Sequence, residues 1–233
     1  MVDLLETRTL TEDLAAYLAA ALRLGASFMV GASPGGAGKT TVMGALLNFV
    51  PEGVELLPAD GMAAIQRGFL EKRRACHLCH EIGPGDYYAY LWGGELRAYF
   101  QLKRHGHLLA TNLHANTLEE ARAQICGENG VPEADFVGMN LVLFLHTAGW
   151  SGPRRVIQVW ESQGDQPHRL LYHQGRLHLE ASQLVDPSHF KHGQTMIRQL
   201  VQSRARTIEE VRQAVVAPSP SLLEERPGGS GGK

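Results

Sequence analysis

The sequence predicts an α/β fold with a mainly parallel, doubly wound sheet and antiparallel strands added at the C-terminal side. Three observations lead to this prediction. The glycine-rich segment "VGASPGGAGKTT" (30–41) lies between an apolar run and a helical pattern. Further β-rich runs follow, in intervals that also hold helical patterns. Two late apolar runs are joined by the short, turn-rich "TAGWSGP", which is typical of an antiparallel pair.

The N-terminal third contains the elements of a phosphate-binding loop. Apolar residues recur at helical spacing from Leu10 to Leu24, and Thr9 with Glu12 predicts a capping box. "SFMVG" (27–31) then predicts a short buried strand. An apolar face from Val42 to Val50 predicts a helix that Pro51 ends. Strand, glycine-rich turn and helix therefore follow in the order that phosphate binding requires.

The rest of the chain alternates strand and helix patterns. A second capping box (Thr117 and Glu120) and a third (Thr207 and Glu210) predict helix starts, and Gln174-Gly175 predicts a hairpin turn. We expect a core domain over 1–184, a C-terminal helical extension over 185–217 and a flexible tail over 218–233. The expected strands are "VELLPAD" (54–60), "DYYAYLWGGE" (86–95), "GHLLATNLH" (106–114), "MNLVLFLH" (139–146) and "RRVIQVW" (154–160).

Composition limits the classes of protein to consider. The chain has 233 residues, of which 44% are hydrophobic, and a formal net charge of -2, so nothing favours nucleic acid as a partner. No apolar run reaches the roughly 20 residues that span a bilayer, and the N-terminus lacks a signal-peptide pattern. Three cysteines are too few for a disulfide framework. These features predict a cytoplasmic protein.

The glycine-rich segment predicts the binding of a nucleoside triphosphate. It ends in Gly38-Lys39-Thr40, as in G-x-x-x-x-G-K-[ST], although Ser33 stands where the first glycine is expected. Backbone N–H groups and the helix dipole would hold the phosphates, Lys39 would reach the β and γ phosphates, and the Thr40 hydroxyl would bind Mg²⁺. The expected nucleotide-binding residues are Gly35, Gly36, Ala37, Gly38, Lys39, Thr40 and Thr41.

Two other segments carry candidate residues. Glu95 follows the β-rich run "YLWGGELR", and in nucleotide hydrolases an acidic residue after a neighbouring strand acts on the metal or on the attacking water. His107 and His114 lie seven positions apart in "GHLLATNLHAN". A histidine pair on its own is more often structural than functional.

Taken together, these segments resemble the hexameric motor ATPases of type II and type IV secretion and of type IV pili. "SPGGAGKTT" is similar to their phosphate loop, "ELLPAD" to their acidic box, Gly94-Glu95-Leu96-Arg97 to their Walker B motif and "GHLLATNLHAN" to their histidine box. The likeness extends from about Thr9 to Glu161.

The resemblance implies a RecA-like core that binds ATP and Mg²⁺ and assembles into a hexameric ring, with an inner-membrane platform protein as partner and a place at the inner membrane's cytoplasmic side. It gives catalytic roles to Lys39, Glu95 and His114, and metal binding to Thr40 and Glu95. Asp60 falls on the aspartate of the acidic box.

The sequence departs from that pattern in ways that predict slow hydrolysis or an incomplete ring. Ala59 replaces the glutamate of the acidic box, and Asn112 replaces a threonine of the histidine box. The segment between Glu95 and Gly106 is shorter than usual. Family members also carry an N-terminal domain before the first strand, where this sequence has only a short segment.

Two alternative functions and one further motif also have to be considered. A P-loop kinase would need an arginine-rich lid, for which Arg73 and Arg74 are the candidates, and a nucleotide-binding scaffold or regulator would bind ATP and hydrolyse it weakly. "CHLCH" (76–80) matches a haem-attachment pattern and offers zinc ligands, but we interpret it as a pair of reduced loop cysteines.

Overall fold

A mixed nine-stranded sheet forms the centre of the molecule. The structure is a computed structural model that describes residues 1–33, 36–147, 149, 152–203, 205 and 207–216. Within these residues the strand order is β2-β3-β5-β1-β6-β7-β8-β9, and β4 pairs with the end of β3. The strands are β1 (Phe28–Gly31), β2 (Glu55–Pro58), β3 (Ala75–Ile82), β4 (Tyr90–Leu91), β5 (Leu108–Leu113), β6 (Leu141–Thr147), β7 (Arg154–Glu161), β8 (Arg169–His173) and β9 (Arg176–Leu177).

The sheet has a parallel half and an antiparallel half. The strands β2, β3, β5, β1 and β6 run parallel, while β7, β8 and β9 each pair antiparallel with the preceding strand. The predicted pair of "MNLVLFLH" and "RRVIQVW" is therefore present as β6 and β7. The predicted hairpin turn is also present, because Gln174 and Gly175 both have positive φ, of 47° and 94°. Parallel ordering brings the carboxyl ends of β1, β3 and β5 to one edge.

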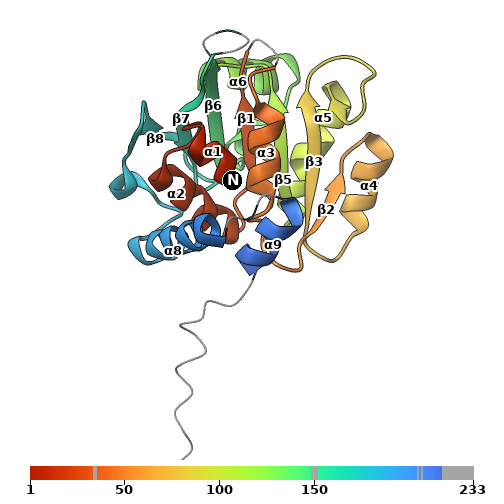
Figure 1. Cartoon of the computed structure of the whole chain (residues 1–233). Helices are drawn as coiled ribbons and strands as arrows, with labels where there is room; N and C mark the ends of the chain where they lie inside the picture. Colours follow the sequence, from red (N-terminus) through yellow and green to blue (C-terminus); the bar gives the residue numbers. More distant parts are fainter. Residues whose placement is uncertain (34–35, 148, 150–151, 204, 206, 217–233) are drawn as a thin grey trace, which may run out of the picture.

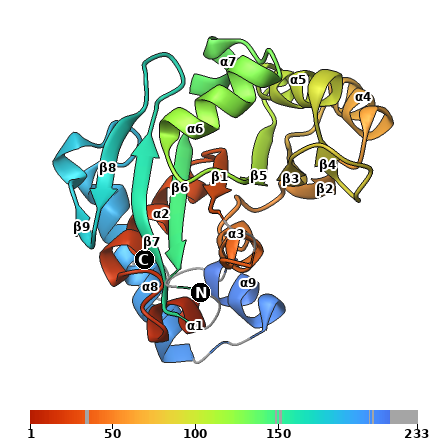
Figure 2. The same cartoon turned by 90° about the horizontal axis from the view of Figure 1, so that it is seen from above.

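Helices cover both faces of the sheet (Figures 1 and 2). On one face α1, α2, α3, α8 and α9 share a hydrophobic cluster with the sheet, and on the other face a second cluster lies under α4 to α7. The helices are α1 (Val2–Glu6), α2 (Glu12–Arg23), α3 (Lys39–Leu47), α4 (Met62–Leu70), α5 (Gly93–Gln101), η1 (Leu102–His105), α6 (Leu118–Arg122), η2 (Ala123–Glu128), α7 (Glu133–Val137), η3 (Leu179–Ala181), α8 (Pro187–Ser203) and α9 (Ile208–Val216).

Helix starts follow local capping chemistry. Thr207 and Glu210 form the reciprocal capping box that the sequence predicts, and the Thr117 hydroxyl accepts the N–H of Glu120. The capping box predicted at Thr9 is wrong. Thr11 caps α2 instead, by accepting the N–H of Leu14 at 3.3 Å, and Thr9 is buried.

Two strand predictions are corrected. Of "DYYAYLWGGE" only Tyr90–Leu91 is a strand, and α5 begins at Gly93. The segment "CHLCH" (76–80), which we interpreted as a loop, lies within the eight-residue strand β3 (Ala75–Ile82), between β2 and β5. Most side chains of this strand are buried, as in an interior strand. Because four of them are cysteines and histidines, the sequence resembles a metal motif and lacks the apolar run that usually identifies such a strand.

The helical pattern at the C-terminal end forms two helices. α8 packs along α2, where the backbone approach is so close that a Cβ at Gly193 would lie 2.2 Å from the Ala16 carbonyl oxygen. α9 is held by Arg212, whose guanidinium donates to the carbonyl oxygens of Asn48, Val50 and Pro51 beyond the end of α3. The division into a domain and an extension stays a prediction, and the predicted tail lies outside the described residues.

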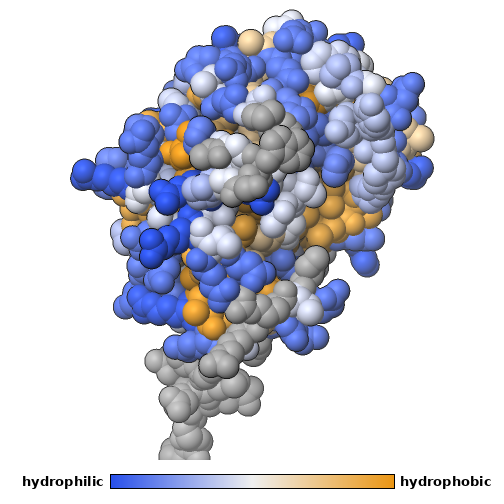
Figure 3. Space-filling view, turned by 45° about the horizontal axis from the view of Figure 1, so that its top comes forward, coloured by the Kyte–Doolittle hydropathy of each residue, from blue (hydrophilic) through white to orange (hydrophobic). Residues whose placement is uncertain are grey.

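The surface hydropathy agrees with the absence of long apolar runs in the sequence. The face in Figure 3 is mostly hydrophilic or neutral, and its hydrophobic atoms form smaller patches. Among the described helices, none combines the length and the apolar character that a membrane crossing would require.

Candidate active site

The glycine-rich segment forms the turn between β1 and α3. Gly36 and Gly38 have φ of 82° and 96°, a conformation that side-chain-bearing residues rarely adopt. Gly38 is the N-cap of α3, so the helix begins at Lys39 with the positive end of its dipole at the turn. The backbone N–H of Ser33 donates to Asn116 Oδ1 at 2.8 Å, which ties the turn's entry to the segment after β5. Gly35 lies outside the described residues.

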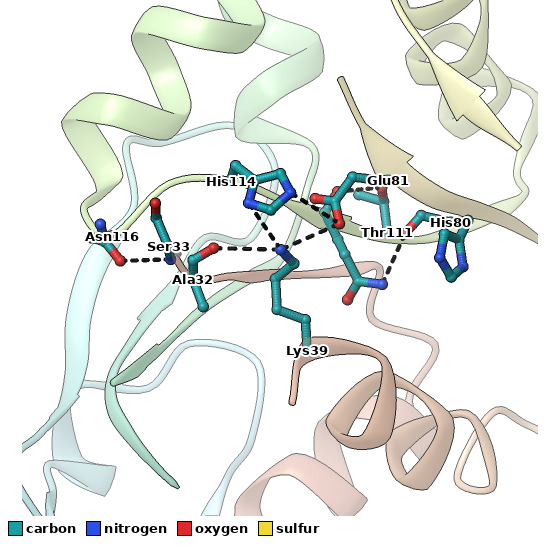
Figure 4. Close-up of polar contacts among 9 residues, drawn as sticks. Ala32, Ser33, Lys39, His80, Glu81, Thr111, His114 and Asn116 are labelled. Carbon is teal, nitrogen blue, oxygen red and sulfur yellow. Dashed lines mark hydrogen bonds and ion pairs between the residues drawn. The ribbon is translucent and has the colours of Figure 1, made fainter. Parts of the chain in front are cut away.

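The Lys39 ammonium lies at the centre of a polar cluster (Figure 4). Lys39 Nζ is 3.2 Å from Glu81 Oε2, 3.3 Å from His114 Nδ1 and 3.4 Å from the Ala32 carbonyl oxygen. Only 8% of the Lys39 side chain and 7% of the Glu81 side chain are exposed. The pair is thus a largely desolvated ion pair, in which each charge depends on the other.

A β-bulge directs Glu81 into this cluster. The register between β3 and β5 shifts between Cys79 and Ile82, and bulges commonly redirect a side chain beside an active site. Ala89, with a φ of 54°, turns its carbonyl oxygen to the N–H groups of His80 at 2.9 Å and Glu81 at 3.4 Å. Asn112 Nδ2 donates to the His80 carbonyl oxygen at 2.9 Å. Asn112 therefore helps hold the strand beside Glu81.

One oxygen of Glu81 has no hydrogen-bond partner among the described residues. Glu81 Oε2 faces Lys39 and lies 3.9 Å from His114 Nε2, whereas Oε1 is buried and accepts no hydrogen bond from the described residues. A buried carboxylate oxygen without a donor is costly unless it binds a ligand, a cation or water. The unpaired oxygen therefore indicates that the cluster binds a ligand, a cation or a water molecule next to Glu81.

The two histidines of "GHLLATNLHAN" lie at opposite ends of β5. His114 follows the carboxyl end and is 45% exposed, within reach of both Lys39 and Glu81. His107 precedes the amino end and is buried, where its Nδ1 accepts the Ala75 N–H at 3.2 Å and its ring packs edge-on against His77. His114 therefore lies in the polar cluster at the cavity, whereas His107 is packed inside the fold, away from it.

A cavity of about 410 Å³ opens over the cluster. Its size is within the range of small-molecule sites, roughly 300 to 1,000 Å³. It brings together nearly all of the described residues that the sequence assigns to phosphate and metal binding. The residues lining it are Gly36, Ala37, Gly38, Lys39, Thr40, Thr41, Glu81, Tyr90, His114 and Arg154.

Glu95 does not line this cavity. It lies in the first turn of α5, where its Oε1 accepts the Met62 N–H at the start of α4 at 3.0 Å. The expectation that it ends a strand beside the phosphate loop is therefore wrong. Glu81, at the end of β3, occupies the position that the sequence analysis gave to Glu95.

The acidic box is also absent from the site. Ala59 is fully buried in the cluster beneath α4 to α7, and Asp60 is exposed. Neither residue lines the cavity.

The two cysteines of "CHLCH" do not converge on one site. Cys76 packs in the cluster under α2 and α3, while Cys79 packs in the cluster on the opposite face of the sheet, so the two thiols point apart. Burial raises the pKa of each thiol to about 12. No group of three or more potential ligands occurs among the described residues.

Arginines near the sequence motifs have partners within the fold. Arg97 donates to the Asn129 carbonyl oxygen at 2.7 Å, and Arg104 pairs with Asp135 at 2.5 Å. Arg73 and Arg74 precede β3 at its amino end, whereas Glu81 is at the carboxyl end. They are therefore poorly placed to form a kinase lid over the cavity.

The residues present fit Mg²⁺ and a nucleoside triphosphate. Thr40 is exposed at the first turn of α3 and its side chain lines the cavity, as a hydroxyl ligand of Mg²⁺ must. The unpartnered Glu81 Oε1 adds an anionic oxygen, the donor type that Mg²⁺ prefers. Lys39 and the positive end of α3 supply the charge that phosphates need.

Comparison with known proteins supports the fold. No protein-family model and no curated protein sequence matches the chain. Among solved structures, the chain is similar to the VirB11 ATPase from the Brucella suis type IV secretion system, solved in complex with sulphate, with a TM-score of 0.50 and 19% sequence identity. The match covers 69% of this chain and 54% of that one, so the chain spans about half the length of its structural relative. The predicted RecA-like fold is confirmed, because the chain shares its mixed α/β fold with that ATPase.

Proposed function

We propose that the protein binds ATP with Mg²⁺ in the cavity over Lys39 and hydrolyses it. The observation that carries the proposal is the convergence of Lys39, Glu81 and His114 from α3, β3 and the end of β5 on one cavity. The buried, unpartnered Oε1 of Glu81 supports it further.

The ion pair gives the site a resting arrangement. Without nucleotide, the Lys39 ammonium neutralises Glu81. When a triphosphate enters, its charge competes for the same ammonium, and Lys39 turns toward the β and γ phosphates. The Glu81 carboxylate is then free to orient a water molecule and to accept its proton.

The Thr40 hydroxyl and Glu81 Oε1 are the candidate contacts for Mg²⁺ or for its bound water. Mg²⁺ supplies neutralisation of the charge on the phosphate oxygens. His114, in contact with both members of the ion pair, is placed to respond when Lys39 changes partner.

The finer function follows the sequence resemblance. We infer that ATP hydrolysis moves subunits of a hexameric ring against one another, and that the ring contacts an inner-membrane platform protein from the cytoplasmic side. The similarity in fold to a secretion-system ATPase supports this inference. The near-neutral charge, a formal net of -2, gives no support to a nucleic-acid partner.

One experiment separates this proposal from its alternatives. ATP turnover is measured with and without candidate phosphate acceptors, and the mass in solution is measured with ATP and Mg²⁺. The proposal predicts acceptor-independent release of phosphate and a six-subunit assembly. Turnover only with an acceptor would show a kinase, and tight ATP binding without turnover would show a scaffold or regulator.

A further inference from the structure

A second cavity adjoins the phosphate cavity and is not lined by Glu81. It has a volume of about 320 Å³ and lies between α1, the start of α3, Leu145 of β6 and the described residues Gly152, Pro153 and Arg154. Ala37, Gly38, Thr41 and Arg154 line both cavities, so the two are adjacent at the phosphate loop.

The walls of the second cavity differ from those of the first. The first holds the ion pair, whereas the described residues that line the second include no lysine, glutamate or histidine. The apolar side chains that line it can pack against a planar ring such as a nucleobase. The hydroxyl and carboxylate groups that line it can form hydrogen bonds with a sugar or with exocyclic polar groups of the base. The side chains that give it this character include Leu4, Val42, Leu145 and Pro153 among the apolar ones and Asp3 and Thr7 among the polar ones.

Arg154 lies where the cavities meet. A Cβ placed on Gly38 would be 3.1 Å from Arg154 Cδ, so the arginine stem crosses the phosphate loop directly over this glycine. The guanidinium makes no hydrogen bond or ion pair with any described residue. An arginine in this position can bind a phosphate or stack on a ring that bridges the cavities.

We infer that the second cavity takes the nucleoside end of the nucleotide whose phosphates lie over Lys39, and that α1 forms one wall of the nucleotide site. The inference rests on the proposed function. It means that a helix of only five residues at the N-terminal side of the fold contributes to affinity for the whole nucleotide and contributes nothing to affinity for the phosphates alone.

The test compares ATP with inorganic tripolyphosphate, which carries the phosphates without a nucleoside. Thr7 is exposed and lines the second cavity and not the first, so Thr7→Phe places a ring in the space for the nucleoside. We expect ATP affinity, measured by calorimetry with Mg²⁺, to fall by about tenfold or more and tripolyphosphate affinity to stay within about twofold.

Two further variants keep the test decisive. Asp3→Phe, within α1, fills the same cavity from a second position and should have the same effect if Thr7→Phe does not fold. Asp13→Phe places the same ring on the exposed first turn of α2, away from both cavities, and should change neither affinity. Thermal unfolding verifies the fold of each variant.

The outcomes separate the two proposals. If the unmodified protein binds neither ATP nor tripolyphosphate, the proposed function is wrong. If it binds ATP, and folded Thr7→Phe and Asp3→Phe bind ATP as tightly as the unmodified protein does, only the nucleoside assignment is overturned. The same holds if both variants lose tripolyphosphate as strongly as ATP.

Discussion

Glu81 Oε2 lies 3.2 Å from Lys39 Nζ, with both side chains almost excluded from solvent. Breaking a buried ion pair by removing one partner is usually costly, by roughly 3 to 5 kcal/mol, because the other charge is left without compensation. The pair therefore affects both stability and function, and variants must separate these effects.

Lys39→Met should abolish detectable ATP binding and also lower the free energy of unfolding. The double variant Lys39→Met/Glu81→Gln removes the uncompensated carboxylate, so it should regain much of the lost stability and still fail to bind ATP. Denaturant unfolding and calorimetry measure the two quantities. Restored ATP binding in the double variant would show that Lys39 acts only as the partner of Glu81.

Ala59→Glu should destabilise the protein and leave ATP turnover no faster. A sequence comparison alone suggests the opposite, because a glutamate at this position would complete the acidic box. Ala59, however, is fully buried among apolar side chains, where a carboxylate has no partner. We expect a loss of several kcal/mol in denaturant unfolding. A stable variant with faster turnover would place residue 59 at the active site after all.

Stability should fall as the pH is lowered from about 6.5 toward 4 because of His77. Burial, with a smaller contribution from nearby His107, lowers the pKa of His77 from 6.5 to about 4. The unfolded chain therefore takes up the proton first, so the stabilisation is complete above pH 6.5 and lost as the pH falls to 4, by about 3 kcal/mol in total.

The matched variant for this prediction is His77→Leu. It should flatten the pH dependence of unfolding in that window, whereas replacing the exposed His192 with Leu should not. An unchanged pH profile in His77→Leu would assign the acid sensitivity to other groups.

Arg212→Met should release α9 from the body of the protein. The guanidinium donates to the carbonyl oxygens of Asn48, Val50 and Pro51, and each such bond to a charged group contributes about 1.5 to 3 kcal/mol. We expect faster amide hydrogen exchange in α9 with little change in the central strands. Equal acceleration in both regions would show that α9 unfolds only together with the sheet.

The sequence predicts most of the fold because its strongest local signals agree with the tertiary structure. The phosphate loop, the β6–β7 pair and the Gln174-Gly175 turn are each specified by a few neighbouring residues. β3 was missed because a central strand is identified by apolar residues, and this one contains two cysteines, two histidines and a glutamate. The environment that buries them comes from the strands on either side, which lie far away in the sequence.

The unrecognised strand also affected the choice of the candidate carboxylate. Glu95 is part of the more conspicuous motif, Gly94-Glu95-Leu96-Arg97, but that motif lies in the first turn of a helix and does not end a strand. Glu81 ends an interior strand two strands away from β1 and reaches Lys39 through a bulge, which no local pattern specifies. A signal was nevertheless present, since "ACHLCHEI" is a run of strand length with an acidic residue near its end, located before the segment that contains His114.

The most direct test of the account compares Glu81→Gln with Glu95→Gln. Each change removes one carboxylate charge and keeps the size of the side chain. We predict that Glu81→Gln binds ATP at least as tightly as the unmodified protein and loses about 10² to 10⁴ in turnover, while Glu95→Gln keeps turnover within about threefold. The decisive measurement is the single-turnover rate of ATP hydrolysis with enzyme in excess. A slow Glu95→Gln beside an unimpaired Glu81→Gln would contradict the assignment of the catalytic carboxylate to β3.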